Sequence, residues 1–514
     1  MSTPPANTGV SILDLPNILT LLFERAGRPL LPGAASTPGL FVRYLRRKPA
    51  RGLAVIYAVD EIGKRKSEHA RDPHRSVSLT LDEQALDGAV IQFSEAQARE
   101  TALEVQPTGV LRAEAIGLSV QAFPADNGLP ALAASCDISL SSVFSAIEQA
   151  ARTQLQDENW TLTQVVAEPV RYKPGNRCVI RYRLTLNHHQ REGGGREGGG
   201  RDESRPYRDE QKHLTIFGKV YADPQQARTV QELQQRLYDE QVSRQGSTLA
   251  GLTARTPLLP RPLGIVDEIG LTLNEAVQPA NAGAAMLTGT RALQPRLEHG
   301  RGGVISSISI PEEELRLTAV ALARLHTSEV RPAGGSPRTG AKEAKRARER
   351  AALIAGHNAP QAETTRRLAQ ELATRLEALE PDTYRPAHGG FKSSQLLFHS
   401  DQVFVVDFDG FCMADAALDV GYFLAYLRPS GLWYRSPGMR EWFEAAARVF
   451  VSTYRQAMLE SGVPAAAVDG IIERSRLYEA ALIFKIATRR VNRLNSPRPG
   501  ELSAMLNEIS TCLV

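Results

Sequence analysis

Two polar loops, separated by a short apolar hairpin, constrain this chain more than any other feature. The first loop, residues 388–395, reads His-Gly-Gly-Phe-Lys-Ser-Ser-Gln, and the second, residues 407–410, reads Asp-Phe-Asp-Gly. An apolar strand predicted at 403–406 leads directly into Asp407. A carboxylate at the exit of a buried strand is a natural ligand for a divalent cation, which prefers hard oxygen donors. The pattern therefore predicts a hairpin that brings two polar loops together at one metal-dependent site.

Length and composition narrow the class of protein. A chain of 514 residues is long enough for several domains with a large buried core, and 42% apolar with 23% charged residues is typical of globular proteins. The net charge of +4 is small, so neither nucleic acid nor a membrane is an expected partner. No apolar run reaches the length of a membrane span. The chain has four cysteines without paired spacing, which fits a reducing compartment: Cys136, Cys178, Cys412 and Cys512. We therefore expect a soluble cytoplasmic protein.

Residues 1–150 are predicted to form an N-terminal α+β domain. Apolar runs at 53–59 and 118–123 indicate strands, and 140–155 has the spacing of a helix. This domain would precede two further domains, at 151–280 and 281–514.

A faint internal repeat links the first two predicted domains. Lys48-Pro49 before one strand echoes Lys173-Pro174 before another, and residues 123–126 echo residues 220–223. These echoes raise the hypothesis that the N-terminal domain is a degenerate copy of the next one. In that alignment Ala122 takes the place of Lys219.

The second predicted domain is rich in strands. A hairpin is expected with its turn at 173–176, where Pro-Gly-Asn separates two β-prone runs. Residues 188–212 contain the sequence Arg-Glu-Gly-Gly-Gly twice, bury almost nothing and are predicted to be a disordered insertion. A strand carrying Lys219 and a helix at 224–242 follow. After residue 311 the pattern is mainly helical, apart from the hairpin at 387–409.

Residues 160–450 resemble the aminoglycoside phosphotransferase and choline kinase superfamily. The strongest match is 407–421, which spaces its acidic residues as the superfamily's D-F-D-G-x-x-x-x-D-P-x-x-D motif does: Asp407, Asp409, Asp415 and Asp419. Residues 321–326, ending in Leu-His, also resemble a helix of that family. The resemblance implies an α+β, protein-kinase-like bilobal fold, with a β-rich N-lobe and a mainly helical C-lobe, preceded here by an extra β-rich domain. It also implies ATP and Mg²⁺ as cofactors.

The resemblance assigns a role to each candidate site residue. Asp407 would be the main magnesium ligand, with Gln395 and Asp409 as further candidates. Lys219 would contact the α- and β-phosphates. Glu232 on the following helix would pair with this lysine, with Asp239 and Glu240 as competitors.

The remaining candidates lie on turns, on the hinge and in the first polar loop. Gly175 would lie at the hairpin tip above the nucleotide, and Glu275 and Val277 at the hinge that reads adenine. His388 would support the catalytic loop and Lys392 would steady the transferring phosphate. Asp415 and Asp419 would cap a helix and orient this loop.

Gly390 departs from the superfamily pattern, because it stands where an aspartate orients the acceptor hydroxyl and accepts its proton. A positioned base contributes roughly 10²–10⁴ in rate. Two functions therefore stay open: an ATP- and Mg²⁺-dependent phosphotransferase acting on a hydroxyl of a small molecule, impaired by this loss, or a catalytically inactive pseudokinase that binds a nucleotide or ligand as a regulatory or scaffold protein. Transfer of another part of ATP is a third outcome.

The acceptor is not specified by the sequence. Arginines on the C-terminal helices favour an anionic or sugar-like ligand over a cationic one: Arg474, Arg476, Arg489, Arg490 and Arg493.

Overall fold

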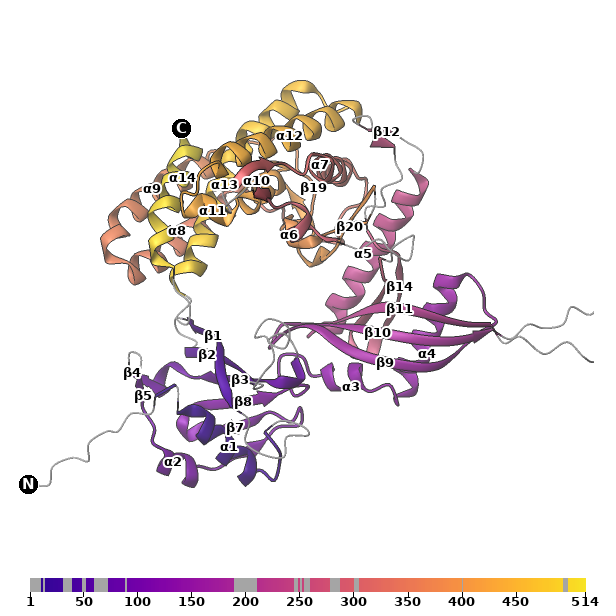
Figure 1. Cartoon of the computed structure of the whole chain (residues 1–514), viewed down its shortest axis with the longest axis vertical. Helices are drawn as coiled ribbons and strands as arrows, with labels where there is room; N and C mark the ends of the chain where they lie inside the picture. The colour runs from indigo at the N-terminus through magenta and orange to yellow at the C-terminus, as the bar shows by residue number, and fades with distance from the viewer. Residues whose placement is uncertain are drawn as a thin grey trace, which may run out of the picture. The chain divides into compact units, whose positions relative to one another are not determined.

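The computed structural model describes residues 11–12, 14–30, 39–48, 52–59, 73–87, 90–188, 210–244, 248–249, 252–253, 259–277, 287–299, 305–399, 401–492 and 498–514. The chain forms two compact units (Figure 1). The first comprises Met1–Gln231 and Pro262–Ala276, and the second comprises Glu232–Arg261 and Val277–Val514. The three-domain division drawn at residues 150 and 280 stays a prediction.

The first unit contains two antiparallel sheets with flanking helices. Its elements in chain order are α1 (Leu15–Arg25), β1 (Leu40–Lys48), β2 (Gly52–Val59), β3 (Ser76–Leu81), β4 (Leu86–Asp87), β5 (Val90–Ile91), α2 (Glu95–Glu100), β6 (Glu104–Val105), β7 (Leu111–Ala113), β8 (Leu118–Ala122), α3 (Leu132–Cys136), α4 (Ser141–Leu155), β9 (Trp160–Lys173), β10 (Arg177–His188), β11 (Glu210–Val220), the start of α5 (Pro224–Ser243), β14 (Pro262–Val266) and β15 (Leu271–Glu275).

The N-terminal sheet has the strand order β1-β2-β3-β8-β7-β6. Helix α1 buries Leu15, Ile18 and Leu22, which the helical period places on one face. These side chains share a core with alternating strand residues such as Val55 and Val77, both fully buried. The sheet is therefore a folded layer with its own hydrophobic core.

The second sheet has the order β14-β15-β11-β10-β9 and a separate core. Helix α4 contributes Val143 and Ile147, which pack with Ile180 and Ile216 of the central strands. The predicted turn at 173–176 joins β9 to β10, with Gly175 in the left-handed region at φ 66°. The predicted insertion falls between β10 and β11, and its residues 189–209 lie outside the described ranges.

The two sheets of the first unit share one topology. In each, a helix precedes three antiparallel strands, a second helix follows, and a closing hairpin places its last strand beside the third: β8 pairs with β3 as β15 pairs with β11. Each closing hairpin turns through a short 3₁₀ helix, Glu114–Ile116 or Asp267–Ile269. A left-handed glycine follows each of these helices, with φ 59° at Gly117 and 58° at Gly270. This agreement favours the duplication hypothesis.

Strand register corrects the alignment on which that hypothesis began. Leu81 of β3 pairs with Leu53 and Leu118, just as Val220 of β11 pairs with Cys178 and Leu271. The residue before each is therefore the equivalent one, so Thr80, not Ala122, stands at the place of Lys219. The error arose because similar short sequences follow β8 and β11, which are not equivalent strands.

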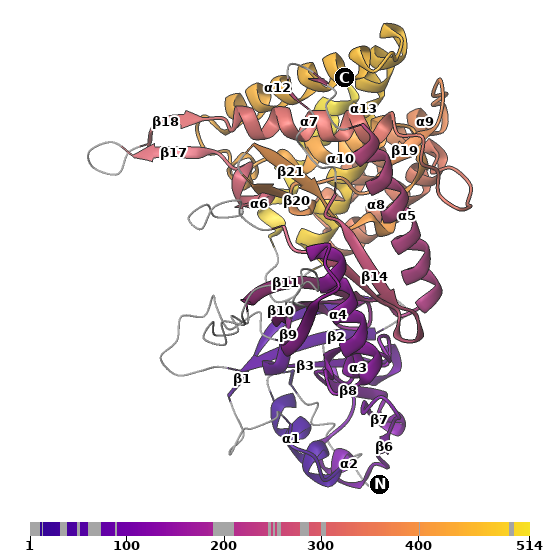
Figure 2. The same ribbon diagram turned by 90° about the vertical axis from the view of Figure 1, so that its right-hand side faces the viewer.

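The second unit is mainly helical (Figure 2). Its elements are the end of α5, β12 (Thr248–Leu249), β13 (Leu252–Thr253), β16 (Leu287–Thr288), α6 (Gly289–Ala292), β17 (Arg296–His299), β18 (Ile305–Ser309), α7 (Glu312–His326), α8 (Gly340–His357), α9 (Ala362–Glu377), β19 (Arg385–Ala387), β20 (Leu396–His399), β21 (Gln402–Val405), β22 (Cys412–Ala414), α10 (Ala417–Leu427), α11 (Ser430–Trp433), α12 (Met439–Glu460), α13 (Ala465–Val491) and α14 (Leu502–Leu513).

One large core holds the second unit together, and it fixes the hairpin that carries both polar loops. Helix α10 is almost wholly buried, and Phe423 stacks on Phe450 of α12 with ring centroids 4.2 Å apart. Strands β20 and β21 form the predicted hairpin, with Leu396 paired to Val405. Within the ranges that the structure describes, no helix has an apolar stretch long enough to cross a bilayer.

Candidate active site

Lys219 lies near the end of β11, between Val179 of β10 and Thr272 of β15. Ile216 and Val220 on this strand are buried in the core, while Lys219 is only half-buried. Its Nζ lies 5.0 Å from the ring centroid of Tyr221. Lys219 thus presents a cation at the sheet surface, and its contact with the phosphates stays a prediction.

The hairpin tip that carries Gly175 is held by a carboxylate from the loop after β8. Asp126 is 1% exposed, and one of its oxygens accepts hydrogen bonds from the Gly175 N–H at 2.7 Å and the Tyr172 hydroxyl at 2.7 Å. Its other oxygen accepts from the Gly128 N–H at 2.8 Å. Burial and the charge of Asp126 raise the pKa of Tyr172, which keeps its hydroxyl protonated as a donor. Asp126 therefore joins the two sheets of the first unit at this tip.

The two hinge candidates flank the point where the chain leaves the first unit. Glu275 ends β15, and its carboxylate accepts a hydrogen bond from the Gln154 amide at 3.4 Å. The unit boundary follows Ala276, so Val277 is the first residue of the second segment of the second unit. That position agrees with a hinge, and the adenine-reading role stays a prediction.

A buried carboxylate, Asp419 of α10, organises the first polar loop. Its oxygens accept the backbone N–H groups of His388 at 2.5 Å, Gly389 at 3.3 Å and Phe391 at 3.3 Å. Burial opposes its ionisation, but hydrogen bonding and the charge of His326 outweigh burial and hold the pKa of Asp419 below its usual value. The loop's backbone shape is thus fixed by an anion outside the loop.

The same loop is braced from two further directions. The His388 side chain is buried, and its Nε2 lies 3.1 Å from the Val406 carbonyl, directly before the second loop. Burial lowers the pKa of His388, so this ring is neutral and supports the loop. Gly389, at φ 71°, leaves no room for a side chain, because a Cβ there would lie 2.1 Å from the Gly410 carbonyl oxygen.

Gly390 and Gln395 are neighbours within the first polar loop. A Cβ added at Gly390 would meet only the Gln395 amide, at 3.9 Å, so an aspartate fits where glycine stands. In one orientation the Gln395 amide donates to Asp407 Oδ2 at 3.3 Å. In the other it donates to the Gly390 carbonyl and its oxygen accepts from Lys392 Nζ at 3.0 Å. The second orientation is better satisfied, and it joins Gly390, Lys392 and Gln395 in one network.

Asp407 fits the metal-ligand role that the sequence predicts. It adopts a left-handed conformation, φ 75° and ψ 55°, which is strained for a residue with a side chain and typical of functional positions. In the second orientation of Gln395, the amide oxygen takes the place of the nitrogen beside the Asp407 carboxylate, so two hard oxygen donors lie at one place. Asp409 is exposed two residues on. In the described part of the chain, no three His, Cys, Asp or Glu side chains converge, and Mg²⁺ needs only one or two protein ligands when phosphates supply others.

The predicted partner of Lys219 has less support. Glu232 lies on the exposed side of α5 and belongs to the second unit. Of its competitors, Asp239 accepts a hydrogen bond from Gln235, and Glu240 accepts hydrogen bonds from the Ser328 hydroxyl and, at 2.7 Å, from the Glu329 N–H. The pairing of Lys219 with Glu232 stays a prediction.

The sequence did not predict the role of Asp126, nor that Asp419 accepts three backbone N–H groups of the first polar loop. Asp126 is a single acidic residue in a polar loop, and nothing local signals its partners at Tyr172 and Gly175. Asp419 was expected to orient the loop, and the Leu-His ending at residue 326 is the signal for its partner, because His326 Nε2 lies 3.6 Å from Asp419. Asp415 caps α10 through the Ala417 N–H at 3.1 Å.

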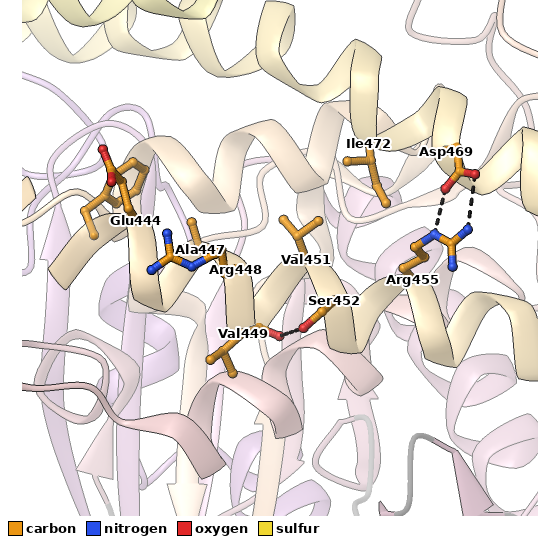
Figure 3. A pocket seen from close by; sticks show the side chains of 10 residues that line it. Glu444, Ala447, Arg448, Val449, Val451, Ser452, Arg455, Asp469 and Ile472 are labelled. Carbon is orange, nitrogen blue, oxygen red and sulfur yellow. Dashed lines mark hydrogen bonds and ion pairs between the residues drawn. The ribbon is translucent and has the colours of Figure 1, made fainter. Parts of the chain in front are cut away.

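A separate open groove of about 830 Å³ lies on α12 and α13 (Figure 3). Its lining includes Val451 and Ile472, and an ion pair between Arg455 and Asp469 at 2.7 Å closes one end. None of the predicted site residues lines it, so it does not belong to the candidate active site.

These observations define a class. A five-stranded sheet with a half-buried lysine, followed by a helical unit whose loop–hairpin–loop carries Lys392, Gln395 and Asp407, is an α+β fold. Residues 234–458 match the model of the phosphotransferase enzyme family. This matched segment includes both polar loops.

Comparison with solved structures gives distant similarities. A glucosamine kinase is 17% identical over 99% of both chains, with a TM-score of 0.39. A glucosamine kinase in complex with glucosamine, ADP and inorganic phosphate is 17% identical over 72% of this chain and 86% of its own, TM-score 0.39. A choline kinase from Streptococcus pneumoniae is 12% identical over 72% of this chain and 98% of its own, TM-score 0.36. No curated protein sequence matches the chain.

Proposed function

We propose that this protein is an ATP- and Mg²⁺-dependent phosphotransferase that acts on a hydroxyl group of a small molecule, at a rate reduced by the glycine at position 390. The match of residues 234–458 to the phosphotransferase enzyme family carries the proposal, because this segment contains both polar loops. The network of Gly390, Lys392 and Gln395, with the Asp407 carboxylate beside it, supports it.

Each residue has a physical task in this proposal. Asp407 and Gln395 hold Mg²⁺, which neutralises the charge of the phosphates when bound. Lys219 contacts the α- and β-phosphates, and Lys392 stabilises negative charge on the transferred group. Asp419 and His388 keep the loop in shape without touching the reactants. Because phosphoryl transfer depends mostly on positioning and charge stabilisation, loss of the base lowers the rate without abolishing it.

The alternative is a pseudokinase that binds nucleotide and transfers nothing. Gly390 favours it, since glycine can neither orient nor deprotonate an acceptor hydroxyl. Both functions require magnesium-dependent nucleotide binding, so that binding is the first test.

We would measure ATP binding by calorimetry, with and without Mg²⁺, in wild type, Asp407→Asn and Asp401→Asn. Asp401 is an exposed carboxylate in the same hairpin and serves as a matched control. Mg²⁺-dependent binding lost only in Asp407→Asn supports the proposed site. No binding by the wild type would refute both the phosphotransferase and the nucleotide-binding pseudokinase.

Restoring the missing carboxylate then separates the two functions. Gly390→Asp is sterically allowed, and Gly390→Asn adds a side chain of the same size without the charge. If the rest of the site is competent, ATP hydrolysis by Gly390→Asp should exceed wild type by roughly 10²-fold or more. Equal rates in wild type, Gly390→Asp and Gly390→Asn, with ATP bound in all three, would favour the pseudokinase.

A further inference from the structure

Most of the arginines that suggested an anionic ligand from sequence are used to hold the fold. Arg474 pairs with Asp415 at 2.8 Å, and Arg476 donates to the Thr511 carbonyl at 3.0 Å. Arg490 pairs with Glu501 at 3.1 Å, and Arg493 lies outside the described residues. Only Arg489 remains, and it belongs to a different cluster.

That cluster lies over two tyrosines one turn apart on α10. Lys485 Nζ lies 5.1 Å from the ring centroid of Tyr422, and Lys392 Nζ lies 5.8 Å from that of Tyr426. Arg489, four residues after Lys485 on α13, donates to the Tyr426 hydroxyl at 3.1 Å. Three cations from the catalytic loop and α13 therefore meet above one face of α10. We call Lys392, Lys485 and Arg489 the cation cluster.

Lys485 is half-buried, and the charges that act on it most strongly are all positive. Burial, the largest cause, and the positive charges of Arg489, Arg350, Arg338 and Lys392 together lower its pKa to about 7. Two of these cations have other partners: Arg338 donates to Glu343 and to the Tyr422 hydroxyl, both at 2.7 Å, and Arg350 donates to the Ala481 carbonyl at 3.0 Å.

No carboxylate pairs with Lys485 or Arg489 in the part of the chain that the structure describes. A tyrosine ring face is a weak partner for an ammonium group, contributing roughly 0.5–2 kcal/mol. Arg489 is exposed, so the cluster is open to solvent. Lys485 and Arg489 are like charges on one helix with no carboxylate paired to either among the described residues, an arrangement that a bound anion would stabilise.

We propose that the cation cluster binds a small oxyanion, a carboxylate or a phosphate monoester, carried by the acceptor molecule. Its identification as an acceptor group rests on the proposed phosphotransferase function, because Lys392 lies two residues from Gly390 in the catalytic loop. The same cluster repels an acceptor with an ammonium group at that position. The acceptor class is therefore an anionic hydroxyl compound.

Sulfate is the suitable probe for the pH series, because it is fully ionised between pH 6 and pH 8.5 and releases no proton of its own. Malonate is compared with it only at pH 7.5, where both malonate carboxyls are ionised. We would titrate each into the full-length protein without nucleotide, at constant ionic strength, by calorimetry. We expect sulfate binding to weaken by about tenfold between pH 6 and pH 8.5, as Lys485 loses its proton. At pH 8 binding should take up close to one proton, seen as a dependence of the enthalpy on the buffer.

Lys485→Met and Lys345→Met test the assignment. Lys345 is exposed on α8 and is not a member of the cation cluster, so it controls for loss of a charge. Lys485→Met should bind sulfate at least about tenfold more weakly, without pH dependence, and Lys345→Met should match wild type. The pKa of Lys485 is lower in the folded protein than in the unfolded chain. As pH falls from about 10.4 to 7, the unfolded chain binds a proton at Lys485 before the folded protein does, so the folded protein loses stability. Lys485→Met should therefore be at least as stable as wild type at pH 7.

The outcomes separate this inference from the proposed function. Sulfate binding that is unaffected by Lys485→Met, or no binding of either probe by wild type, overturns the anion site, whatever ATP does. If Lys485→Met weakens Mg²⁺-ATP binding as much as sulfate binding, the cluster serves the nucleotide and the acceptor assignment is wrong. Lys485-dependent sulfate binding without ATP binding supports the anion site and refutes the phosphotransferase. Tighter binding of malonate than of sulfate would identify the acceptor group as a carboxylate, and the reverse as a phosphate monoester.

Discussion

The two sheets of the first unit share the order of five strands, to which the N-terminal sheet adds β6, but they differ at the one position that would matter for nucleotide binding. The second sheet carries Lys219 near the end of its third strand, whereas the N-terminal sheet carries the exposed Thr80 there. Both keep the left-handed glycine before the last strand, Gly270 and Gly117. Features needed for folding are present in both sheets, and the cation proposed for phosphate binding is present in one.

This difference indicates what each sheet does. The N-terminal sheet lacks the lysine, yet the loop after its strand β8 supplies Asp126, which holds the hairpin tip of the other sheet. We infer that the N-terminal sheet supports the hairpin that carries Gly175 and does not itself bind a nucleotide. Three changes would sharpen or break this comparison.

The largest effect is expected from Asp126→Ala. The change leaves the Tyr172 hydroxyl and the Gly175 and Gly128 N–H groups without their acceptor, which should cost roughly 3 kcal/mol of unfolding free energy. Denaturant unfolding measures this loss. Asp137→Ala is a control, because Asp137 bonds only to nearby Ser139 at an exposed site. Equal losses in the two variants would show that Asp126 does not join the sheets.

A smaller effect, on binding, is expected from Lys219→Met. Loss of charge-assisted hydrogen bonds to phosphate should weaken ATP binding by about 2 kcal/mol, roughly 30-fold. Thr80→Met, at the equivalent place in the other sheet, should bind ATP as wild type does. Calorimetry on both variants gives the answer, and a loss in Thr80→Met comparable to that in Lys219→Met would mean that the N-terminal sheet also binds nucleotide.

The smallest effects are expected from Gly117→Ala and Gly270→Ala. Alanine is strained at φ near 60°, and each Cβ would press on neighbours, at 3.2 Å from Ala85 or 3.0 Å from Pro224. Each change should lower the unfolding free energy by about 1–2 kcal/mol. Gly356→Ala, on an open face of α8, should instead be neutral or stabilising. Thermal unfolding of the three variants measures these changes. Clearly different losses of unfolding free energy in Gly117→Ala and Gly270→Ala would show that the two turns are not equivalent.

Much of the fold and part of the site could be predicted from sequence. The hairpin and its two loops follow from apolar strands bounded by polar residues, and the helices after residue 311 follow from their periodicity. The place of Thr80 could not be predicted, since short sequence echoes cannot reveal which strands are equivalent. The cation cluster was also missed: Lys485 and Lys392 are far apart in sequence, and only the folded structure brings them over Tyr422 and Tyr426, one turn apart on α10.

Asp419 shapes the first polar loop from outside it, through the backbone N–H groups of His388, Gly389 and Phe391. None of those bonds involves the side chain at position 390, so the loop folds equally well around glycine or aspartate. Selection for a stable protein therefore does not act on the base at this position. Activity can be lost or regained there by one substitution in a scaffold that is already folded.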